Sequence, residues 1–185
     1  MIIRIRREAD ADLDEVHAVH TAAFARADRV DEPVMEAVLA DQLRDDPGWA
    51  PRLTLVAEVD GVLAGGVTTS YGILAIDAAA ITGPSMEIAL PAPGPVGVHP
   101  RFQGRGVGMA LMHALIGAAE ALDEPALMLL GSPDFYGRFG FVAASSVGIQ
   151  APEPAWGDHF QVLQLTGFDR SMTGRYRYVA PFDGF

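Results

Sequence analysis

The stretch VHPRFQGRGVGMALMHAL, residues 98–115, places a glycine-rich loop directly before a run of apolar, helix-forming residues. After the loop, apolar residues advance by three or four positions at Val107, Leu111, Leu115, Ala118 and Leu122. This spacing predicts a helix that starts among Gly104, Gly106 and Gly108 and ends near Pro125. A helix N-terminus presents backbone N–H groups and the positive end of the helix dipole, and glycine lets a ligand approach the backbone closely. The stretch therefore predicts an anion site that suits a phosphate group.

The spacing of these glycines excludes two common phosphate-binding loops. A dinucleotide-binding fingerprint would need glycine at position 109, which is Met, and a P-loop would need a lysine, which the chain does not contain. A structural alternative stays open, in which the glycines only make a tight turn between a strand and a helix.

Composition limits the class of protein. At 185 residues, half of them hydrophobic, the chain has the size of one domain, residues 1–185. The absence of cysteine and lysine excludes thiolate metal sites, cysteine nucleophiles and Schiff-base chemistry. The net charge of -11 repels phosphate backbones and attracts cationic small molecules, so we expect no nucleic-acid partner. The apolar stretches are shorter than the roughly 18 residues of a membrane span, and residues 1–6 lack a signal-peptide core, so we expect a cytoplasmic protein with no membrane partner.

Two histidines on the first predicted helix raise the question of a metal ion. His17 and His20 stand three positions apart and could face one ion, but no third histidine or cysteine is near them in the sequence. Such a pair is usually a surface feature, so we expect no metal.

The rest of the first half alternates between strand and helix patterns. Helices are predicted over residues 12–24, where Asp12 and Glu15 have capping-box spacing, and over residues 33–44. Strands are predicted over residues 2–6, 53–59, 62–74, 86–90 and 96–98, with a hairpin turn at Asp60-Gly61. Because each proline lacks a backbone N–H, Pro91, Pro93 and Pro95 predict that the fourth strand is interrupted or bulged.

A second motif follows the predicted strand over residues 126–130. In GSPDFYGRFGF, residues 131–141, Ser132 is expected to cap a short helix whose first residue is Pro133. Tyr136 then lies in the opening turn, near the end of the strand. The structural alternative is that Tyr136 is a core aromatic packed beside Phe135 and Phe139.

These motifs together resemble the GNAT superfamily of N-acyltransferases. Gln103-x-x-Gly106-x-Gly108, preceded by Val98-x-Pro100, resembles its acyl-CoA pyrophosphate loop, and Tyr136 with Gly140-Phe141 matches its Y-x-x-x-G-F stretch. RFQGRGVG, FYGRFGF and YRYVAPF resemble the YhbS-like branch, and the order of elements agrees from Ile2 to Phe168. The resemblance implies an α/β fold in one GNAT domain, with a mixed, mostly antiparallel sheet flanked by helices and splayed between strands four and five. Residues 142–185 would be its C-terminal strands and tail.

The resemblance also implies the reaction and its residues. The expected function is acetyl-CoA-dependent N-acetylation of a small-molecule or peptide amine by direct attack, with Tyr136 as the general acid. The N–H group of Val96 would polarise the thioester carbonyl. Residues expected to bind acetyl-CoA are Val96, Gly97, Val98, Gln103, Gly104, Arg105 through its backbone, Gly106, Val107, Gly108 and Ser132.

Three positions depart from the family pattern. The chain contains no asparagine, so either Ser132 replaces the asparagine that many members use for the pantetheine arm or that contact is missing. Glu87 is the only acid on the fourth strand and is a weak candidate for the general base. Gly97 stands where a larger residue is commoner, which widens the acyl pocket or serves the bulge.

The acceptor amine is not identified by the sequence. Its contacts are expected from the two N-terminal helices and the loop around residues 76–85. A non-enzymatic acyl-CoA sensor is the alternative function, and a homodimer stays open.

Overall fold

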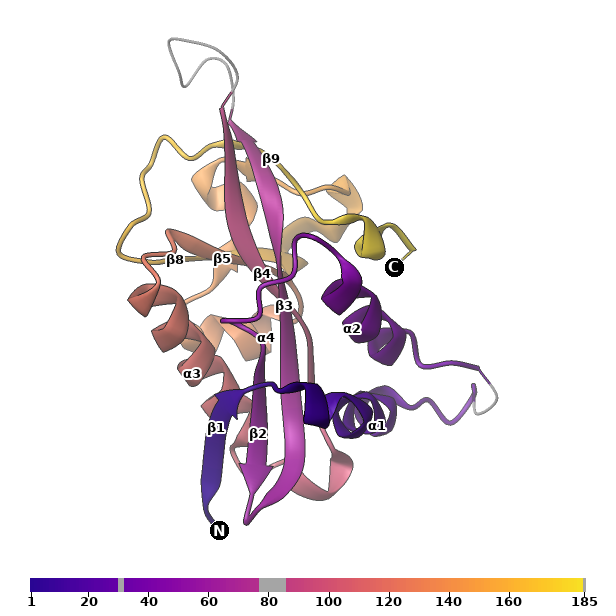
Figure 1. The fold of residues 1–185 in the computed structure, drawn as a ribbon. Helices are drawn as coiled ribbons and strands as arrows, with labels where there is room; N and C mark the ends of the chain where they lie inside the picture. Colours follow the sequence, from indigo (N-terminus) through magenta and orange to yellow (C-terminus); the bar gives the residue numbers. More distant parts are fainter. Residues whose placement is uncertain (30–31, 77–85, 185) are drawn as a thin grey trace. The chain divides into compact units, whose positions relative to one another are not determined.

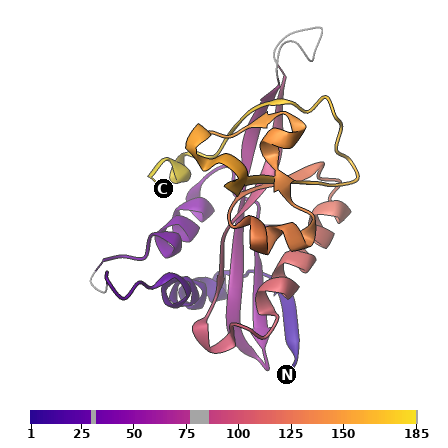
Figure 2. The same cartoon turned by 180° about the vertical axis from the view of Figure 1, so that it is seen from behind.

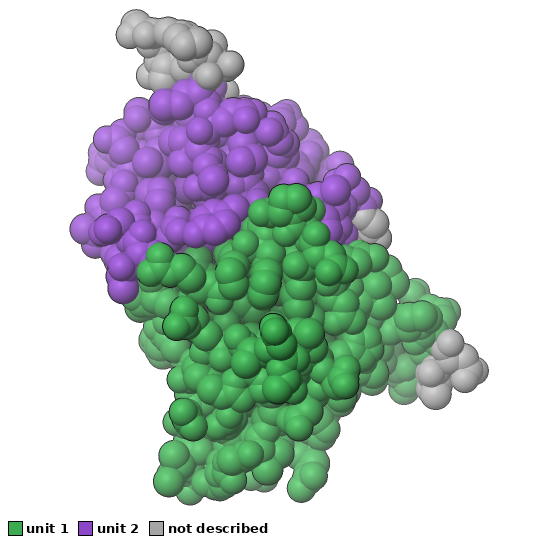
Figure 3. Space-filling model, viewed as in Figure 1, with its two compact units in different colours: residues 1–70, 93–118, 184–185 green, residues 71–92, 119–183 purple. Residues whose placement is uncertain are grey.

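The computed structural model describes residues 1–29, 32–76 and 86–184 (Figure 1). The chain divides into two compact units, residues 1–70 with 93–118 and 184–185, and residues 71–92 with 119–183 (Figure 3). Strands β3 (Val62–Ile76) and β4 (Glu87–Val98) and helix α3 (Val107–Ala121) each contribute residues to both units.

The first unit begins with an antiparallel meander. β1 (Ile3–Arg7) pairs with β2 (Leu55–Val59), from Ile3 opposite Val59 to Arg7 opposite Leu55. β2 turns into β3 at Asp60-Gly61, where both residues have positive φ, 50° and 84°. This is the geometry of a two-residue hairpin whose twist matches its strands. The hairpin expected at this dipeptide is therefore confirmed.

β4 is one continuous strand, so the interruption expected at its prolines is wrong and the bulge is the correct alternative. The N–H of Ile76 donates to the carbonyl of Met86, and the N–H of His99 donates to the carbonyl of Ala64. Between these two contacts β4 is about one residue longer than the stretch of β3 that it pairs with, as a bulged strand is. Counting from Met86, Pro91 and Pro93 fall on the edge away from β3, where no N–H is needed.

Counting back from His99 gives the orientation of the end of β4. Alternation places Gly97 toward β3 and turns the N–H groups of Val96 and Val98 to the opposite edge. The Val98 carbonyl accepts a 2.9 Å hydrogen bond from the Gln103 side chain, which agrees with its facing away from β3. This outer edge of β4 is the part of the fold on which the candidate site rests.

Two glycines of β3 bring helices close to its two faces. A Cβ atom on Gly66 would contact His20 and Val16 of α1 (Leu13–Phe24), at 3.4 and 3.5 Å. A Cβ atom on Gly65 would contact Leu111 of α3 at 3.1 Å. Since consecutive strand residues face opposite sides, α1 and α3 cover opposite faces of β3.

α1 starts without the predicted capping box. Asp12 occupies the N-cap position, but its side chain makes no cap hydrogen bond. Its carboxylate instead accepts two hydrogen bonds from Arg6, at 2.6 and 2.8 Å, and one from the N–H of Ala9. A bidentate, charge-assisted pair is stronger than a neutral cap bond and takes the carboxylate first. The Arg6 hydrogen bond also holds the pKa of Asp12 below its ordinary value.

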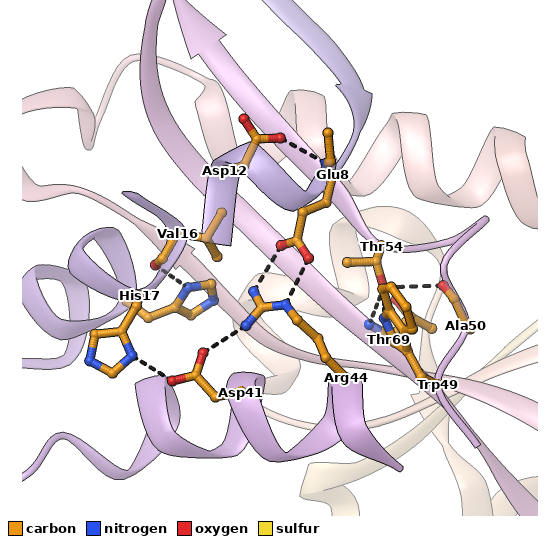
Figure 4. Close-up of polar contacts among 12 residues, drawn as sticks. Glu8, Asp12, Val16, His17, Asp41, Arg44, Trp49, Ala50, Thr54 and Thr69 are labelled. Carbon is orange, nitrogen blue, oxygen red and sulfur yellow. Dashed lines mark hydrogen bonds and ion pairs between the residues drawn. The ribbon is translucent and has the colours of Figure 1, made fainter. Parts of the chain in front are cut away.

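A buried ion pair joins α2 (Met35–Asp45) to the end of β1 (Figure 4). The Arg44 guanidinium donates to both carboxylate oxygens of Glu8, at 2.7 and 2.8 Å, and these side chains are 9% and 4% exposed. Arg44 also donates to Asp41, whose other oxygen lies 2.7 Å from the His17 ring. The network ties α1, α2 and β1 together at one side of the unit.

The second unit contains the remaining strands (Figure 2). β5 (Ala126–Leu130) pairs with β8 (Phe160–Gln164), which pairs with β6 (Val142–Ala143). The end of β3 pairs with β9 (Gly174–Arg177), and β9 pairs in parallel with β7 (Ile149–Gln150). The pairs β1–β2, β2–β3, β3–β9, β5–β8 and β6–β8 are antiparallel. The expected α/β class with a mixed, mostly antiparallel sheet is confirmed.

The core of the second unit gathers apolar residues of these strands around two aromatics. Phe160 and Tyr176 are buried with their ring centroids 5.7 Å apart, and the Tyr176 hydroxyl donates to the carbonyl of Leu90. Gly72 provides room for this tyrosine, because a Cβ atom there would overlap its hydroxyl. This core includes Met128 of β5, the strand that precedes α4 (Pro133–Tyr136).

Replacing Gly65 tests the close packing of β3. A Cβ atom at this position would lie 2.9 Å from the Gly97 carbonyl, which is backbone and cannot rotate away. We expect Gly65→Ala to lower the free energy of unfolding by about 1–3 kcal/mol, the usual cost of overpacking. Gly117 lies on the exposed face of α3 with open space around its Cα. Gly117→Ala should therefore raise the free energy of unfolding by about 0.5–1 kcal/mol. Urea unfolding measures both, and equal stability of the two variants would contradict the packing described here.

Candidate functional site

The loop before α3 has the backbone of an anion site. Gln103 to Gly106 form exposed turns, and α3 begins at Val107, which is buried. Gly104 and Gly106 have φ values of +70° and +84°, and no atom lies within 4 Å of a Cβ built on either residue. Their backbone therefore needs glycine and stays accessible. The first N–H groups of the helix have no partner within the helix and are available to an anion.

The end of β4 and this loop are joined by the Gln103 side chain. Its Nε2 donates to the carbonyl of Val98, which ties the loop to the outer edge of β4. Val96 and Val98 are partly exposed, whereas Gly97 between them is buried. The structure thus brings three of the predicted site residues, Gln103, Val98 and Val96, to the same edge of the first unit, with the α3 N-terminus following in the chain.

Gly97 has a role that the sequence did not indicate. A Cβ atom there would lie 3.1 Å from His20 and 3.3 Å from Phe24, so aromatic side chains of α1 fill the space that a larger residue would use. The two rings stack with their centroids 6.2 Å apart. Gly97 therefore accommodates α1, and no acyl pocket opens at its Cα.

Tyr136 lies in the second unit, at the end of α4. Its ring lies against the backbone just after β5, because a Cβ atom on Gly131 would be 2.3 Å from Tyr136 Cε2. Phe135 and Phe141 pack edge-on against it, with centroids 4.9 and 5.8 Å away. Burial raises the pKa of the Tyr136 phenol above its ordinary value of about 10. The ring is held as a core aromatic is held, and the phenol stays protonated over the whole neutral range.

The surroundings of Ser132 and Glu87 support their expected roles less than those of Tyr136 do. Ser132 occupies the N-cap position of α4 as expected, but its exposed side chain makes no cap hydrogen bond. Glu87 is half exposed and accepts a 2.9 Å hydrogen bond from Arg177. Its carboxylate is therefore committed to an ion pair at the start of β4, which does not favour it as a general base.

The two histidines of α1 do not form a pair. His17 is on the surface beside Asp41, whereas His20 is fully buried against β3 and β4. Across residues 1–29, 32–76 and 86–184, no three His, Cys, Asp or Glu side chains gather as metal ligands would. Within those same ranges, every helix is too short or too polar to span a bilayer.

Comparison with known proteins identifies the family. A family model described as an acetyltransferase (GNAT) domain matches residues 4–144. The chain belongs to this GNAT acetyltransferase family, and it is an enzyme of the acetyltransferase class.

Individual relatives agree over nearly the whole chain. The uncharacterized N-acetyltransferase YjhQ of Escherichia coli K12 is 27% identical over 175 residues, 92% of this chain and 89% of that protein. A GNAT family acetyltransferase from Brucella melitensis, solved with acetyl-CoA, is 27% identical with a TM-score of 0.72, covering 98% of this chain and 99% of that one. YhbS of Escherichia coli, solved with CoA, has a TM-score of 0.79 at 24% identity, covering 98% and 92%. The fold expected for the YhbS-like branch is confirmed.

Proposed function

We propose that this chain transfers the acetyl group of acetyl-CoA to the amine of a small molecule or peptide. The observation that carries the proposal is the accessible N-terminus of α3, preceded by positive-φ glycines and tied by Gln103 to the outer edge of β4. The relative from Brucella melitensis, solved with acetyl-CoA, supports the same donor. One N-acetyltransferase domain would span residues 1–185, with residues 142–185 as its C-terminal strands and tail.

The donor would be held mainly by backbone. Its pyrophosphate would accept hydrogen bonds from the loop and the first turn of α3, from Gln103 to Gly108, with Arg105 contributing only its backbone. The amides of its pantetheine arm would run along residues 96–98 as an added strand does, pairing with the outer edge at Val96 and Val98 while Gly97 between them faces β3. Ser132 would supply the side-chain contact for which the chain has no asparagine.

The chemistry then needs few side chains. The N–H of Val96 polarises the thioester carbonyl as negative charge develops on its oxygen. The amine attacks directly, so that a C–N bond forms as the C–S bond breaks. The departing thiolate takes a proton from the phenol of Tyr136, which burial keeps protonated. The net charge of -11 favours cationic or neutral acceptor amines.

Other features of the proposal remain predictions. Of the loop around residues 76–85, which is expected to contact the acceptor, residues 77–85 lie outside the described residues. A cytoplasmic location and a homodimer also stay predictions.

Substitution of Gly106 tests the donor site. Gly106→Glu forces a side chain onto a positive-φ position and adds a negative charge beside the pyrophosphate, so we expect acetyl-CoA affinity to fall at least about 100-fold. Gly117→Glu adds the same charge at an exposed position of α3 and should keep wild-type affinity. Titration calorimetry measures both. Unchanged affinity in Gly106→Glu would place the anion site elsewhere.

Removal of the Tyr136 hydroxyl tests the general acid. Tyr136→Phe keeps the ring packing, so we expect kcat to fall by about 100-fold or more while acetyl-CoA affinity is retained. Because the raised pKa delays ionisation of the phenol, the wild-type rate should decline only above pH 10, and the variant should lack this decline. Tyr71→Phe is the matched control, because it removes a different tyrosine hydroxyl, one that donates to Glu124.

The assay follows free CoA with a panel of amines. Equal kcat in the wild type and Tyr136→Phe would reduce Tyr136 to a packing residue. If both forms bind acetyl-CoA tightly and acetylate no amine, the sensor becomes the better description.

A further inference from the structure

Phe24 is the last residue of α1, and its side chain lies against the end of β4. Its Cε2 atom is 3.3 Å from the position that a Cβ atom on Gly97 would take. The ring also stacks on His20, with the two centroids 6.2 Å apart and the planes 14° from parallel. Phe24 is partly exposed, whereas Gly97 is buried. The ring therefore covers Gly97 from the α1 side and keeps part of its own surface accessible.

His20 fixes the plane on which Phe24 packs. The imidazole is fully buried, and its two nitrogens lie 2.9 Å from the Val16 carbonyl oxygen and 3.3 Å from the Pro95 carbonyl oxygen. These carbonyls belong to α1 and to β4, so the imidazole is held between the helix and the strand. A ring stacked on a group held in this way has little room to move aside. Phe24 thus forms a fixed wall over this part of β4.

The opposite face of β4 is filled by other side chains. The Val98 Cγ2 atom would lie 3.3 Å from a Cβ atom on Gly65, on the face that α3 covers. Because consecutive strand residues face opposite sides, Val96 shares this face with Val98, and Gly97 faces α1. The end of β4 is therefore covered by valine side chains and α3 on one face and by aromatic rings of α1 on the other.

Phe24 also lines a cavity, which the valine side chains do not. The cavity has a volume of about 360 Å³, and its walls include the apolar side chains of Pro33, Val34 and Met35 at the start of α2. Among the described residues that line it, none belongs to β4. One ring thus contacts both the strand and the cavity. Its removal would open the space over Gly97 toward this cavity.

We propose that Phe24 restricts the donor to a short acyl group, accepting acetyl and disfavouring propionyl and butyryl. The acyl chain begins at the carbonyl that the Val96 N–H is proposed to polarise, one residue before Gly97. An acetyl group needs room for a single methyl group at this point. Each further carbon meets the Phe24 ring on one face of β4 or valine side chains on the other. This inference rests on the proposed function and names the class of acyl donor that the site selects.

Affinity for CoA thioesters of increasing chain length tests the inference without an acceptor amine. Titration calorimetry compares acetyl-CoA, propionyl-CoA and butyryl-CoA on the wild type and on Phe24→Ala. We expect the wild type to bind butyryl-CoA at least about 10-fold more weakly than acetyl-CoA, the usual effect of an extra methylene in a packed apolar site. Phe24→Ala removes the ring over Gly97, so its affinity for butyryl-CoA should rise to that for acetyl-CoA, which itself should stay unchanged.

Two further variants complete the experiment. Val16→Ala is the matched control, because Val16 packs the same helix against Gly66 of β3 and is fully buried. It loosens α1 without uncovering β4 and should keep the wild-type preference. Phe24→Leu keeps an apolar side chain but lacks the outer ring atoms, so it should relax the preference in the same direction even if Phe24→Ala does not fold. Circular dichroism checks the folding of each variant.

The outcomes separate this inference from the proposed function. Equal affinity of the wild type for acetyl-CoA and butyryl-CoA would overturn the inference and leave the donor site standing. A preference that persists in Phe24→Leu and Phe24→Ala, or that Val16→Ala relaxes to the same extent, would also overturn it. If the wild type binds none of the three thioesters, the proposed function fails together with the inference.

Discussion

The bulge in β4 is the constraint on which the candidate site depends. With one residue more than the stretch of β3 that it pairs with, the strand changes which of its residues face β3 between Met86 and His99. Pro91 and Pro93 then fall on the outer edge in the middle of the strand, and the N–H groups of Val96 and Val98 fall there at its end. On the outer edge of β4, the prolines therefore offer no N–H group for pairing. The residues where the donor is proposed to bind do offer such groups.

Glycines determine how closely aromatic rings and a carbonyl group approach the strands. Gly66 and Gly97 lie under the His20 ring, Gly65 lies against the Gly97 carbonyl, and Gly131 lies under the Tyr136 ring. Each absence of a side chain lets an aromatic ring or a carbonyl come close to a strand. The rings of His20 and Tyr136 therefore both lie against glycine backbone, which leaves room for them and fixes their planes.

The sequence predicted features that depend on local chemistry. The hairpin at Asp60-Gly61, the start of α3 after its glycines and the strand over residues 126–130 all follow from neighbouring residues, and the structure confirms them. The predictions from sequence failed where a residue distant in the chain determines the local structure. Asp12 binds Arg6 instead of capping α1, and β4 stays continuous because pairing with β3 continues past its prolines. The burial of His20 was also not predicted, because only the packing of α1 on two strands shows that this residue lies beside Pro95.

Hydrogen exchange of the amides at the end of β4 measures whether the donor binds at the outer edge of this strand. Saturating acetyl-CoA should slow exchange of the Val96 and Val98 amides, because the donor pairs with this edge. The Gly97 amide faces β3 and should be protected with or without the donor. Residue-resolved exchange measured by NMR separates these three positions. If acetyl-CoA binds and the Val96 and Val98 amides exchange as fast as before, the outer edge of β4 does not hold the donor.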